Sequence, residues 1–300
     1  MASADGPRAL SLLSLASRQA SPQGAVQITG RTLRRPMAKG LLKLVASLIW
    51  IYSYVTLGFM MAMAAVPGWY LSQWGWGLDI TPQWPRAHLV LDPLIGLYFT
   101  ILGFFVFGLA LMVVLPTVKF IFRFKPVVGE IPIHSFRIWS WYNVNGMQFM
   151  FNTVFGRFAR ATTIYPVYLR WMGAKIGRDV VFNTQHVYDL DIITVGDKTV
   201  IGANASILGH VGEKGKLVRA PITIGKNCTI GQYANVFPGV TMGDNCHVGA
   251  MSLVPKGSRL DANSVYGGVP VRKIRELKVG EKATADELSA TAGVPADSDP

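Results

Sequence analysis

Residues 222–254 read ITIGKNCTIGQYANVFPGVTMGDNCHVGAMSLV, and a large apolar residue returns in this segment at every sixth position. Glycine often follows that apolar residue, and a small or branched residue stands four positions after it. A hexapeptide period of this kind is typical of a parallel β-helix. The apolar series comprises Ile176, Phe182, Tyr188, Val195, Ile201, Ile207, Ile224, Ile230, Val236, Met242, Val248, Val254, Leu260 and Tyr266.

The period has a simple physical basis. Each hexad supplies one flat side and one turn, and three hexads close a coil of about 18 residues whose turns pair about 4.8 Å apart. The large apolar residue points inward, the small residue lies near the tight corner, and glycine relieves backbone strain at the turn. Such a coil is left-handed, against the usual handedness of parallel crossovers. We therefore predict an all-β left-handed parallel β-helix over residues 173–276.

The two cysteines fit this repeat. Cys228 and Cys246 are 18 residues apart, and their pattern is neither a metal motif nor a disulfide framework. Both occupy the small inward position of a hexad. We predict that they are neighbours in successive coils, where a free cysteine behaves as a small apolar residue.

Two irregularities interrupt the period. Between Tyr188 and Val195 the spacing is seven residues, so an extra residue is expected near 189–194. Residues 209–221, GHVGEKGKLVRAP, break the pattern entirely. We expect this second segment to leave the coil as a loop, and loops on rigid scaffolds commonly carry function.

The N-terminal half has the composition of a membrane segment. Only 15% of the chain is charged, against roughly 25% in ordinary globular proteins, and residues 44–78 and 93–118 carry no charge. A bilayer core needs about 20 apolar residues in a helix. The pair Pro67-Gly68 is expected to end the first helix near Val66. We predict a transmembrane α-helical hairpin across residues 41–125.

The charges around the hairpin predict its orientation. Basic residues flank its outer ends, whereas the connecting loop has only Arg86, and positive flanks stay on the cytoplasmic side. We therefore expect a multi-pass membrane protein with the β-helix on the cytoplasmic side and the aromatic loop at the far interface. The flanking residues are Arg31, Arg34, Arg35, Lys39, Lys119, Arg123 and Lys125, and the loop aromatics are Trp69, Tyr70, Trp74, Trp76 and Trp84.

Three segments complete the domain prediction. Residues 1–40 hold five serines, six Lys or Arg and one acid, which suits either a transit peptide or a disordered basic arm beside the membrane. Residues 126–172 mix aromatics with arginines, as interfacial amphipathic segments do. Residues 277–300 form an acidic tail that we expect to be disordered. The net charge of +12 accompanies no nucleic-acid motif, so we expect no nucleic-acid partner.

The repeats resemble the hexapeptide-repeat acyltransferase family over residues 168–274. The motifs that carry the resemblance are ITVGDKTVIGAN at 193–204, the His210 loop followed by ITIGKNCTIG, PGVTMGDNCHVGAMSLV at 238–254, and GGVP at 267–270. Together with YLRWMGAKIGRDV at 168–180 and the spans before it, the chain is most similar to the C-terminal membrane-plus-β-helix region of poly-lysine synthetase-type peptide synthetases.

The resemblance implies an acyltransferase with His210 as general base. Histidine suits this role because its pKa lies near neutrality. The family binds its acyl donor between subunits of a homotrimer, and the donor is acyl-CoA or a carrier-protein thioester, so a carrier protein is a possible partner beside the bilayer. No cofactor is bound permanently, and no metal is expected. In the acyl-donor site the resemblance implies backbone amides at Gln232 and Ala250. Lys256, Arg272 and Lys273 are basic residues near the closure motif and suit either contacts to the donor's phosphates or a solvated face.

Some assignments stay open. His186 falls at a nominally inward small position, so it either marks the irregularity or lines the acceptor pocket. Asp189 and Asp191 lie nearby and suit either acceptor binding or turn chemistry, whereas His247 is expected on the surface. Val271 stands where the family usually has alanine, which leaves contacts to the nucleotide end of the acyl donor open.

Two rival functions use the same fold. A zinc hydratase of the γ carbonic anhydrase type needs two further histidines where this chain has Gln232 and Phe237, and zinc catalysis requires three protein ligands. The other rival is a non-catalytic scaffold or partner-binding module on the membrane, which would not need His210. A fold alone does not choose between them.

Overall fold

The computed structural model describes residues 34–78, 90–133, 135–278, 281 and 283. The chain forms two compact units, Met1–Leu44 and Val45–Pro300, and the coil and the candidate site belong to the second. The predictions for residues 1–33, for Trp84 and Arg86, and for most of the acidic tail lie outside the described residues.

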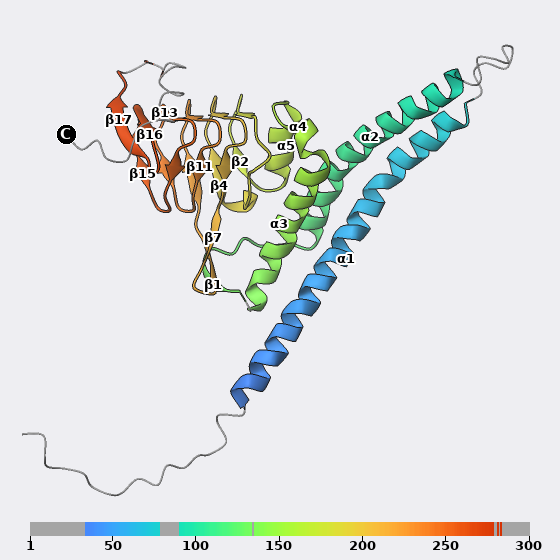
Figure 1. Cartoon of the computed structure of the whole chain (residues 1–300), viewed down its shortest axis with the longest axis horizontal. Coiled ribbons are helices and arrows are strands. Elements are labelled where there is room, and N and C mark those ends of the chain that lie inside the picture. Colours follow the sequence, from blue (N-terminus) through green and yellow to red (C-terminus); the bar gives the residue numbers. More distant parts are fainter. Residues whose placement is uncertain (1–33, 79–89, 134, 279–280, 282, 284–300) are drawn as a thin grey trace, which may run out of the picture. The chain divides into compact units, whose positions relative to one another are not determined.

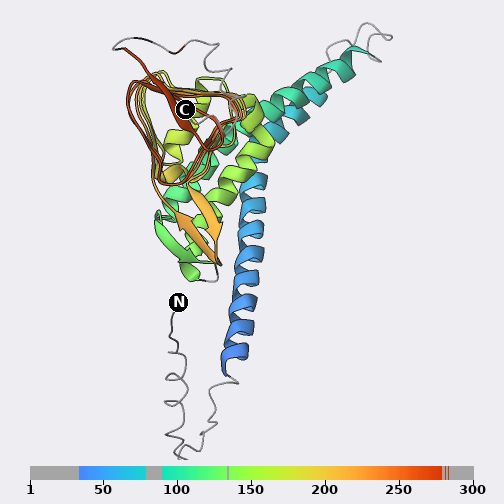
Figure 2. The ribbon, with the colours of Figure 1, turned by 60° about the vertical axis from the view of Figure 1, so that its left-hand side comes forward.

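Three sheets of parallel strands form the sides of a coil, and Figure 2 looks along it, so that successive turns overlie one another. Strands in neighbouring turns pair residues 18 apart, as Thr229 with His247, Asn235 with Leu253 and Thr241 with Arg259. The first sheet contains β3 (Val181–Phe182), β5 (Val200–Ile201), β10 (Thr229–Ile230), β13 (Cys246–Val248), β16 (Ser264–Gly267) and antiparallel β17 (Arg272–Glu276). The second sheet contains β6 (Ser206–Ile207), β11 (Asn235–Val236) and β14 (Leu253–Val254). The third sheet contains β2 (Lys175–Ile176), β4 (Ile193–Val195), β9 (Ile222–Ile224), β12 (Thr241–Met242) and β15 (Arg259–Leu260).

The inward residues are those that the hexad period predicts from Ile201 onward. Ile201, Ile230 and Val248 are fully buried, as are Ile207 and Val236 on the next sheet. The pairing of Thr229 with His247 sets Cys228 beside Cys246. Both cysteines are buried free thiols, which confirms their predicted stacking. Burial raises the pKa of Cys228 to about 11 and raises that of Cys246 further, so both thiols stay protonated at neutral pH.

In the first turns the predicted phase is wrong at Tyr188. Val187, and not Tyr188, is the fully buried residue that pairs with Ile207. Phe182 pairs with Ile201, so this corner is one residue shorter than the corners that follow it. Thr184 therefore takes the small inward position, and its Oγ1 donates to the Ala205 carbonyl. The extra chain length lies in the 3₁₀ turn η3 (Leu190–Ile192), which follows Asp189.

Two helices in the described residues are long and apolar enough to cross a membrane: Ile51–Trp76 within α1 (Arg34–Trp76), and α2 (Leu91–Ile121). The predicted end of the first helix near Val66 is wrong, because α1 continues through Pro67, and Trp69, Trp74 and Trp76 lie in the helix. Gly68 serves close packing instead. A Cβ at Gly68 would stand 2.2 Å from the carbonyl oxygen of Gly103, and such small-residue contacts are typical of packed membrane helices.

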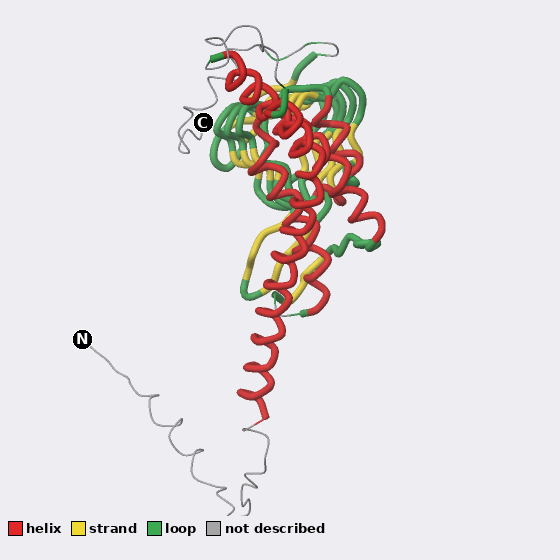
Figure 3. The backbone as a smooth tube through the Cα atoms, turned by 90° about the vertical axis from the view of Figure 1, so that its right-hand side faces the viewer, coloured by secondary structure: helices red, strands yellow, loops and turns green. Residues whose placement is uncertain are grey.

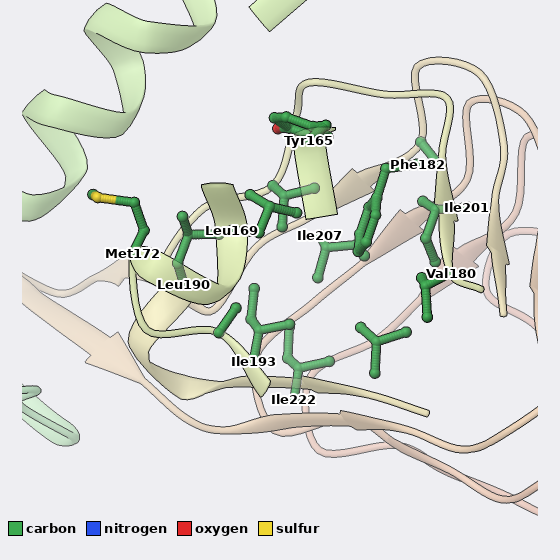
Figure 4. Packing of buried hydrophobic residues seen from close by; sticks show 14 of the residues in the cluster. Tyr165, Leu169, Met172, Val180, Phe182, Leu190, Ile193, Ile201, Ile207 and Ile222 are labelled. Atoms are coloured by element: carbon green, nitrogen blue, oxygen red, sulfur yellow. The ribbon is translucent and has the colours of Figure 1, made fainter. Parts of the chain in front are cut away.

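Residues 126–172 form no single amphipathic surface segment, contrary to the prediction. They supply β1 (Gly129–Pro132), η1 (Phe136–Ile138), α3 (Trp139–Phe151), the π-helical turn η2 (Asn152–Gly156), α4 (Arg157–Ala159) and α5 (Ile164–Trp171). Figure 3 shows helices across one end of the coil, and of this region α5 contacts β2 and β3 of the first turn. Figure 4 shows Tyr165, Leu169 and Met172 of this region packed beside Phe182 and Ile193 of the first turns. One apolar core thus joins α1, α2 and α3 to the coil.

The C-terminal boundary also differs from the prediction. Leu277, placed in the disordered tail by its sequence, is 6% exposed. The backbone oxygen of Glu281 accepts a hydrogen bond from Asn245 Nδ2 at 3.1 Å, and its carboxylate pairs with Arg275 at 3.0 Å. The described residues of the tail therefore contact the outside of the coil.

The buried register gives a stability prediction. Val236→Ala should destabilise the protein by about 1–3 kcal/mol, because it removes a fully buried branched side chain from the coil and leaves a cavity. Val200→Ala is the matched control, since Val200 faces outward on β5 and is 41% exposed; it should cost less than about 0.5 kcal/mol. Thermal unfolding of the detergent-solubilised full chain, followed by circular dichroism, measures both. Equal effects would contradict the register.

Candidate active site

The segment that breaks the hexad period leaves the coil as a β-hairpin rather than as an open loop. Its strands are β7 (His210–Glu213) and β8 (Lys216–Arg219), and β1 from before α3 adds a third strand by pairing antiparallel with β8. Figure 1 shows this small sheet, labelled at β7 and β1, away from the coil; β8 is its central strand, between β1 and β7. The third strand had no sequence signal, and it fixes the base of the hairpin where His210 begins β7.

His210 pairs with Asp189. The Nδ1 atom of His210 lies 2.6 Å from Asp189 Oδ2, with the histidine side chain 25% exposed and the carboxylate fully buried. A carboxylate at this position binds the Nδ1 proton and leaves the Nε2 lone pair for the reaction. The Trp141 ring meets the imidazole edge to face, with ring centroids 4.9 Å apart. The geometry thus holds one tautomer and one ring orientation.

The Asp189 carboxylate is held from several sides. Its Oδ1 accepts hydrogen bonds from Trp141 Nε1 at 2.7 Å and from Asn145 Nδ2 at 3.3 Å. The Asp189 backbone N–H donates to Asn145 Oδ1 at 3.1 Å. Burial acts to raise the pKa of Asp189, but the hydrogen bond from His210 and the charges of His210 and Arg219 lower it below its ordinary value. Asp189 is therefore ionised at neutral pH.

Arg219 completes this cluster. Its side chain is 1% exposed, and its Nε donates to Asp189 Oδ1 at 3.1 Å. One terminal nitrogen donates to Asp191 Oδ1 at 2.8 Å and the other to the Val127 carbonyl. Buried charges persist when they are paired and hydrogen-bonded. Asp189 and Asp191 were candidates for binding the acceptor, and the structure places both against Arg219, with Asp189 also beneath His210.

His186 lies at the shortened corner, where its backbone N–H donates to Thr184 Oγ1 at 3.1 Å. The shortened corner moves it out of the inward position expected for it, and it is half-buried. Burial, with help from Arg160 and Arg157, lowers its pKa. The neighbouring Gln185 carbonyl accepts a hydrogen bond from Asn152 Nδ2 at 2.6 Å, which ties this corner to η2.

The predicted acyl-donor contacts lie at a different corner from His210. Gln232 and Ala250 follow β10 and β13, where the chain passes from the first sheet to the second, one turn of the coil apart. The hairpin leaves between β6 and β9, where the chain passes from the second sheet to the third. One copy of the chain therefore does not bring these amides and His210 to the same corner.

The three basic residues are engaged within the chain or exposed. Lys256 pairs with Glu213 of the hairpin at 2.5 Å, which places it by the hairpin. Lys273 pairs with Asp261 at 3.1 Å and with Glu276 at 2.5 Å, and the Glu276 hydrogen bond is the main cause of its raised pKa. Arg272 is exposed on β17.

The predicted surface position of His247 is wrong. His247 lies in β13 and is 4% exposed, and Nε2 of its ring lies 3.2 Å from Asn245 Oδ1. Within the described residues, no group of three or more His, Cys, Asp or Glu side chains is placed to hold a metal ion.

Sequence reasoning missed Trp141, Asn145 and Arg219. Arg219 stands in the segment that breaks the period, so its place in a departing loop was a usable signal. Trp141 and Asn145 belong to a segment interpreted as interfacial, and nothing local in the sequence connects them to a carboxylate more than 40 residues away.

Comparison with known proteins points to the same class of repeat. Residues 221–250 match the family model described as the hexapeptide repeat of succinyl-transferase. Delta-poly-L-ornithine synthetase of Acinetobacter baumannii (strain AB307-0294) is 21% identical to this chain over 181 residues, which is 58% of this chain and 13% of that protein. The chain thus matches a small part of that relative's length.

Solved structures overlap this chain in part. A maltose O-acetyltransferase from Clostridium difficile 630 is 27% identical, covers 36% of this chain and 61% of its own, and has a TM-score of 0.31. A galactoside acetyltransferase in complex with coenzyme A is 34% identical, with coverages of 34% and 55% and a TM-score of 0.30. The repeat match and the curated relative, rather than these overlaps, support the predicted resemblance to hexapeptide-repeat acyltransferases.

Proposed function

We propose that this chain is a membrane-anchored acyltransferase built on a left-handed parallel β-helix, with His210 as general base. The observation that carries the proposal is the 2.6 Å contact between His210 Nδ1 and the buried Asp189 carboxylate. A coil serving only as a scaffold needs no buried carboxylate aligned behind a half-exposed histidine. General bases are commonly oriented by such a third group.

The reaction is transfer of an acyl group from a pantetheine thioester to a hydroxyl or amine. The acceptor oxygen or nitrogen attacks the thioester carbonyl while His210 Nε2 takes its proton. A new carbon–oxygen or carbon–nitrogen bond forms, the carbon–sulfur bond breaks, and the thiolate leaves and takes up the proton. Asp189 stays ionised and stabilises the imidazolium that forms.

The acyl group and its carrier follow from resemblance. The A. baumannii relative is named a poly-ornithine synthetase, which favours an aminoacyl group on a carrier-protein thioester. Two similar structures are named as complexes with coenzyme A and acetyl coenzyme A, which favours acyl-CoA. Both carriers present the same pantetheine arm.

Release of free thiol tests the proposal. The full chain is supplied with a simple amine and with either acetyl-CoA or an aminoacyl carrier protein, and the release of free thiol is followed. Thiol release by the wild type that is lost in His210→Ala is the supporting result.

We propose that the site is shared between subunits of a homotrimer. The amides at Gln232 and Ala250 lie at a different corner from His210, so a neighbouring copy must bring the acyl donor to the histidine. Chemical cross-linking of the full chain in detergent should give a three-subunit species as its largest product. A monomer that turns over substrate would contradict the shared site.

The two apolar helices are proposed to cross the bilayer as a hairpin, with the β-helix on the cytoplasmic side. Basic residues at the outer flanks support this orientation. A membrane-impermeant maleimide should label Gln73→Cys in intact cells and label Lys278→Cys only after lysis. The background should be low, because burial raises the pKa of both natural thiols. Labelling of Lys278→Cys in intact cells would reverse the topology.

A further inference from the structure

An apolar groove lies between α1 and α3. It has a volume of about 670 Å³, within the range of cavities that hold small-molecule ligands. Leu57, Gly58 and Met61 line one wall, and Phe149 and Met150 belong to the other. The α1 wall belongs to the candidate membrane span Ile51–Trp76. If this helix crosses the bilayer as proposed, the groove lies at the level of the lipid alkyl chains.

The groove also reaches the candidate active site. Trp141 and Asn145 line it, and both donate hydrogen bonds to Asp189 Oδ1. The Trp141 ring touches the groove and stands edge to face against His210. A chain whose polar end lies at Trp141 would therefore have that end one tryptophan ring away from the imidazole.

One polar group in the groove wall is unsatisfied. Ser53 is 5% exposed and lines the groove, and its hydroxyl has no hydrogen-bond partner among the described residues. A buried hydroxyl without a partner costs about 1–3 kcal/mol. A ligand with a polar group beside its alkyl chain would satisfy it, whereas a plain hydrocarbon would not.

We propose that this groove binds the alkyl chain of a membrane amphiphile whose amine or hydroxyl head is the acceptor at His210. The inference rests on the proposed function, since it names the class of acceptor. The acceptor is favoured over the acyl donor as the occupant for two reasons. The groove adjoins the base that deprotonates the acceptor, and a thioester on CoA or a carrier protein arrives from water rather than from the bilayer.

The test compares propylamine and dodecylamine as acceptors, with acetyl-CoA as acyl donor and the full chain in liposomes. Met61→Trp should fill the groove, and Gly58→Leu should do so as well, since a Cβ at Gly58 meets nothing within 4 Å. Met63→Trp is the matched control, because Met63 is 49% exposed and lies outside the groove. Partitioning of dodecylamine into the bilayer is the same for all proteins, so it cancels.

The ratio of kcat/KM for dodecylamine to that for propylamine should fall at least tenfold in Met61→Trp and Gly58→Leu, and stay within twofold in Met63→Trp. An equal ratio in all proteins would overturn the assignment of the groove to the alkyl chain of the acceptor. A loss confined to palmitoyl-CoA as donor, with propylamine as acceptor, would assign the groove to the acyl donor and also overturn the inference.

Photo-cross-linking separates this inference from the proposed function. A dodecylamine carrying a diazirine in its chain should label α1 between Ser53 and Met61 in the wild type and in Met63→Trp, and not in Met61→Trp. Labelling without turnover of any amine or hydroxyl acceptor would support the chain site and reject the acyltransferase. Turnover without labelling would support the acyltransferase and reject the groove as the site of the alkyl chain.

Discussion

His210→Ala should lower kcat for acyl transfer by about 10²–10⁴-fold, the usual contribution of a general base. The substitution removes the partly exposed imidazole that the buried Asp189 carboxylate orients. The KM for the acyl donor should change little, because backbone amides are proposed to hold the pantetheine arm. The stability cost should be below about 1 kcal/mol, since the side chain lies at a partly exposed hairpin base. Steady-state kinetics on the purified trimer measures kcat and KM separately.

Lys214→Ala is a control in the same hairpin, because Lys214 lies at the exposed turn between β7 and β8. It should keep wild-type kinetics. Gln232→His combined with Phe237→His, which supplies the two histidines a zinc hydratase would need, should not restore activity to His210→Ala. Full activity in His210→Ala would remove the residue from the mechanism and favour a non-catalytic scaffold.

Asp189→Asn should have the second large effect. Kcat should fall by about 10²–10⁴-fold, because an amide no longer fixes the Nδ1 proton or stabilises the imidazolium. Stability should also fall, by about 3–5 kcal/mol, because the buried Arg219 guanidinium loses a charged partner. The pH profile of kcat/KM separates the two effects, since a purely structural loss lowers the profile without moving it. An unmoved profile in folded Asp189→Asn would contradict the positioning role.

Asp191→Asn is the matched control for charge. It removes the other carboxylate from Arg219 and leaves the contact between Asp189 and His210 in place, so kcat should fall less than tenfold.

Acid unfolding gives a further check on the ionised state of Asp189. The pKa of Asp189 in the folded protein lies below its ordinary value of 3.8, so its contribution to stability is complete above that pH and is lost as the pH falls through the lower folded pKa.

The coil could be predicted because its physical cause is periodic. One inward apolar residue in six recurs regardless of what the rest of the chain does, so Ile230, Val236 and Val248 were assigned correctly. The phase of the first turns was not predicted correctly. The corner at 182–187 is one residue shorter than a hexad, the 3₁₀ turn that follows adds residues, and the two changes nearly cancel in the overall spacing. A period cannot reveal where such compensating changes lie.

Features that depend on distant partners could not be predicted. Pro67 suggested a helix end, but α1 continues through it, and the close approach of Gly68 to Gly103 on α2 left no signal in the local sequence. The pairing of β1 with β8 joins residues more than 80 positions apart. The interrupted repeat marked the segment that holds His210, and the family resemblance implied its role. The role of Asp189 depends on a backbone conformation at φ 61° that the sequence did not indicate.

Mass spectrometry of cells that express the wild-type chain, His210→Ala or neither can decide whether this protein is an acyltransferase, and it does so without assuming a particular substrate. The wild-type cells should contain an acylated amine or hydroxyl compound that is absent, or about 10²–10⁴-fold less abundant, in the other two, in line with the loss of a general base. Equal amounts of membrane-inserted wild-type and His210→Ala protein are the necessary control. Identical metabolite and lipid profiles in all three would contradict an enzymatic role for this site.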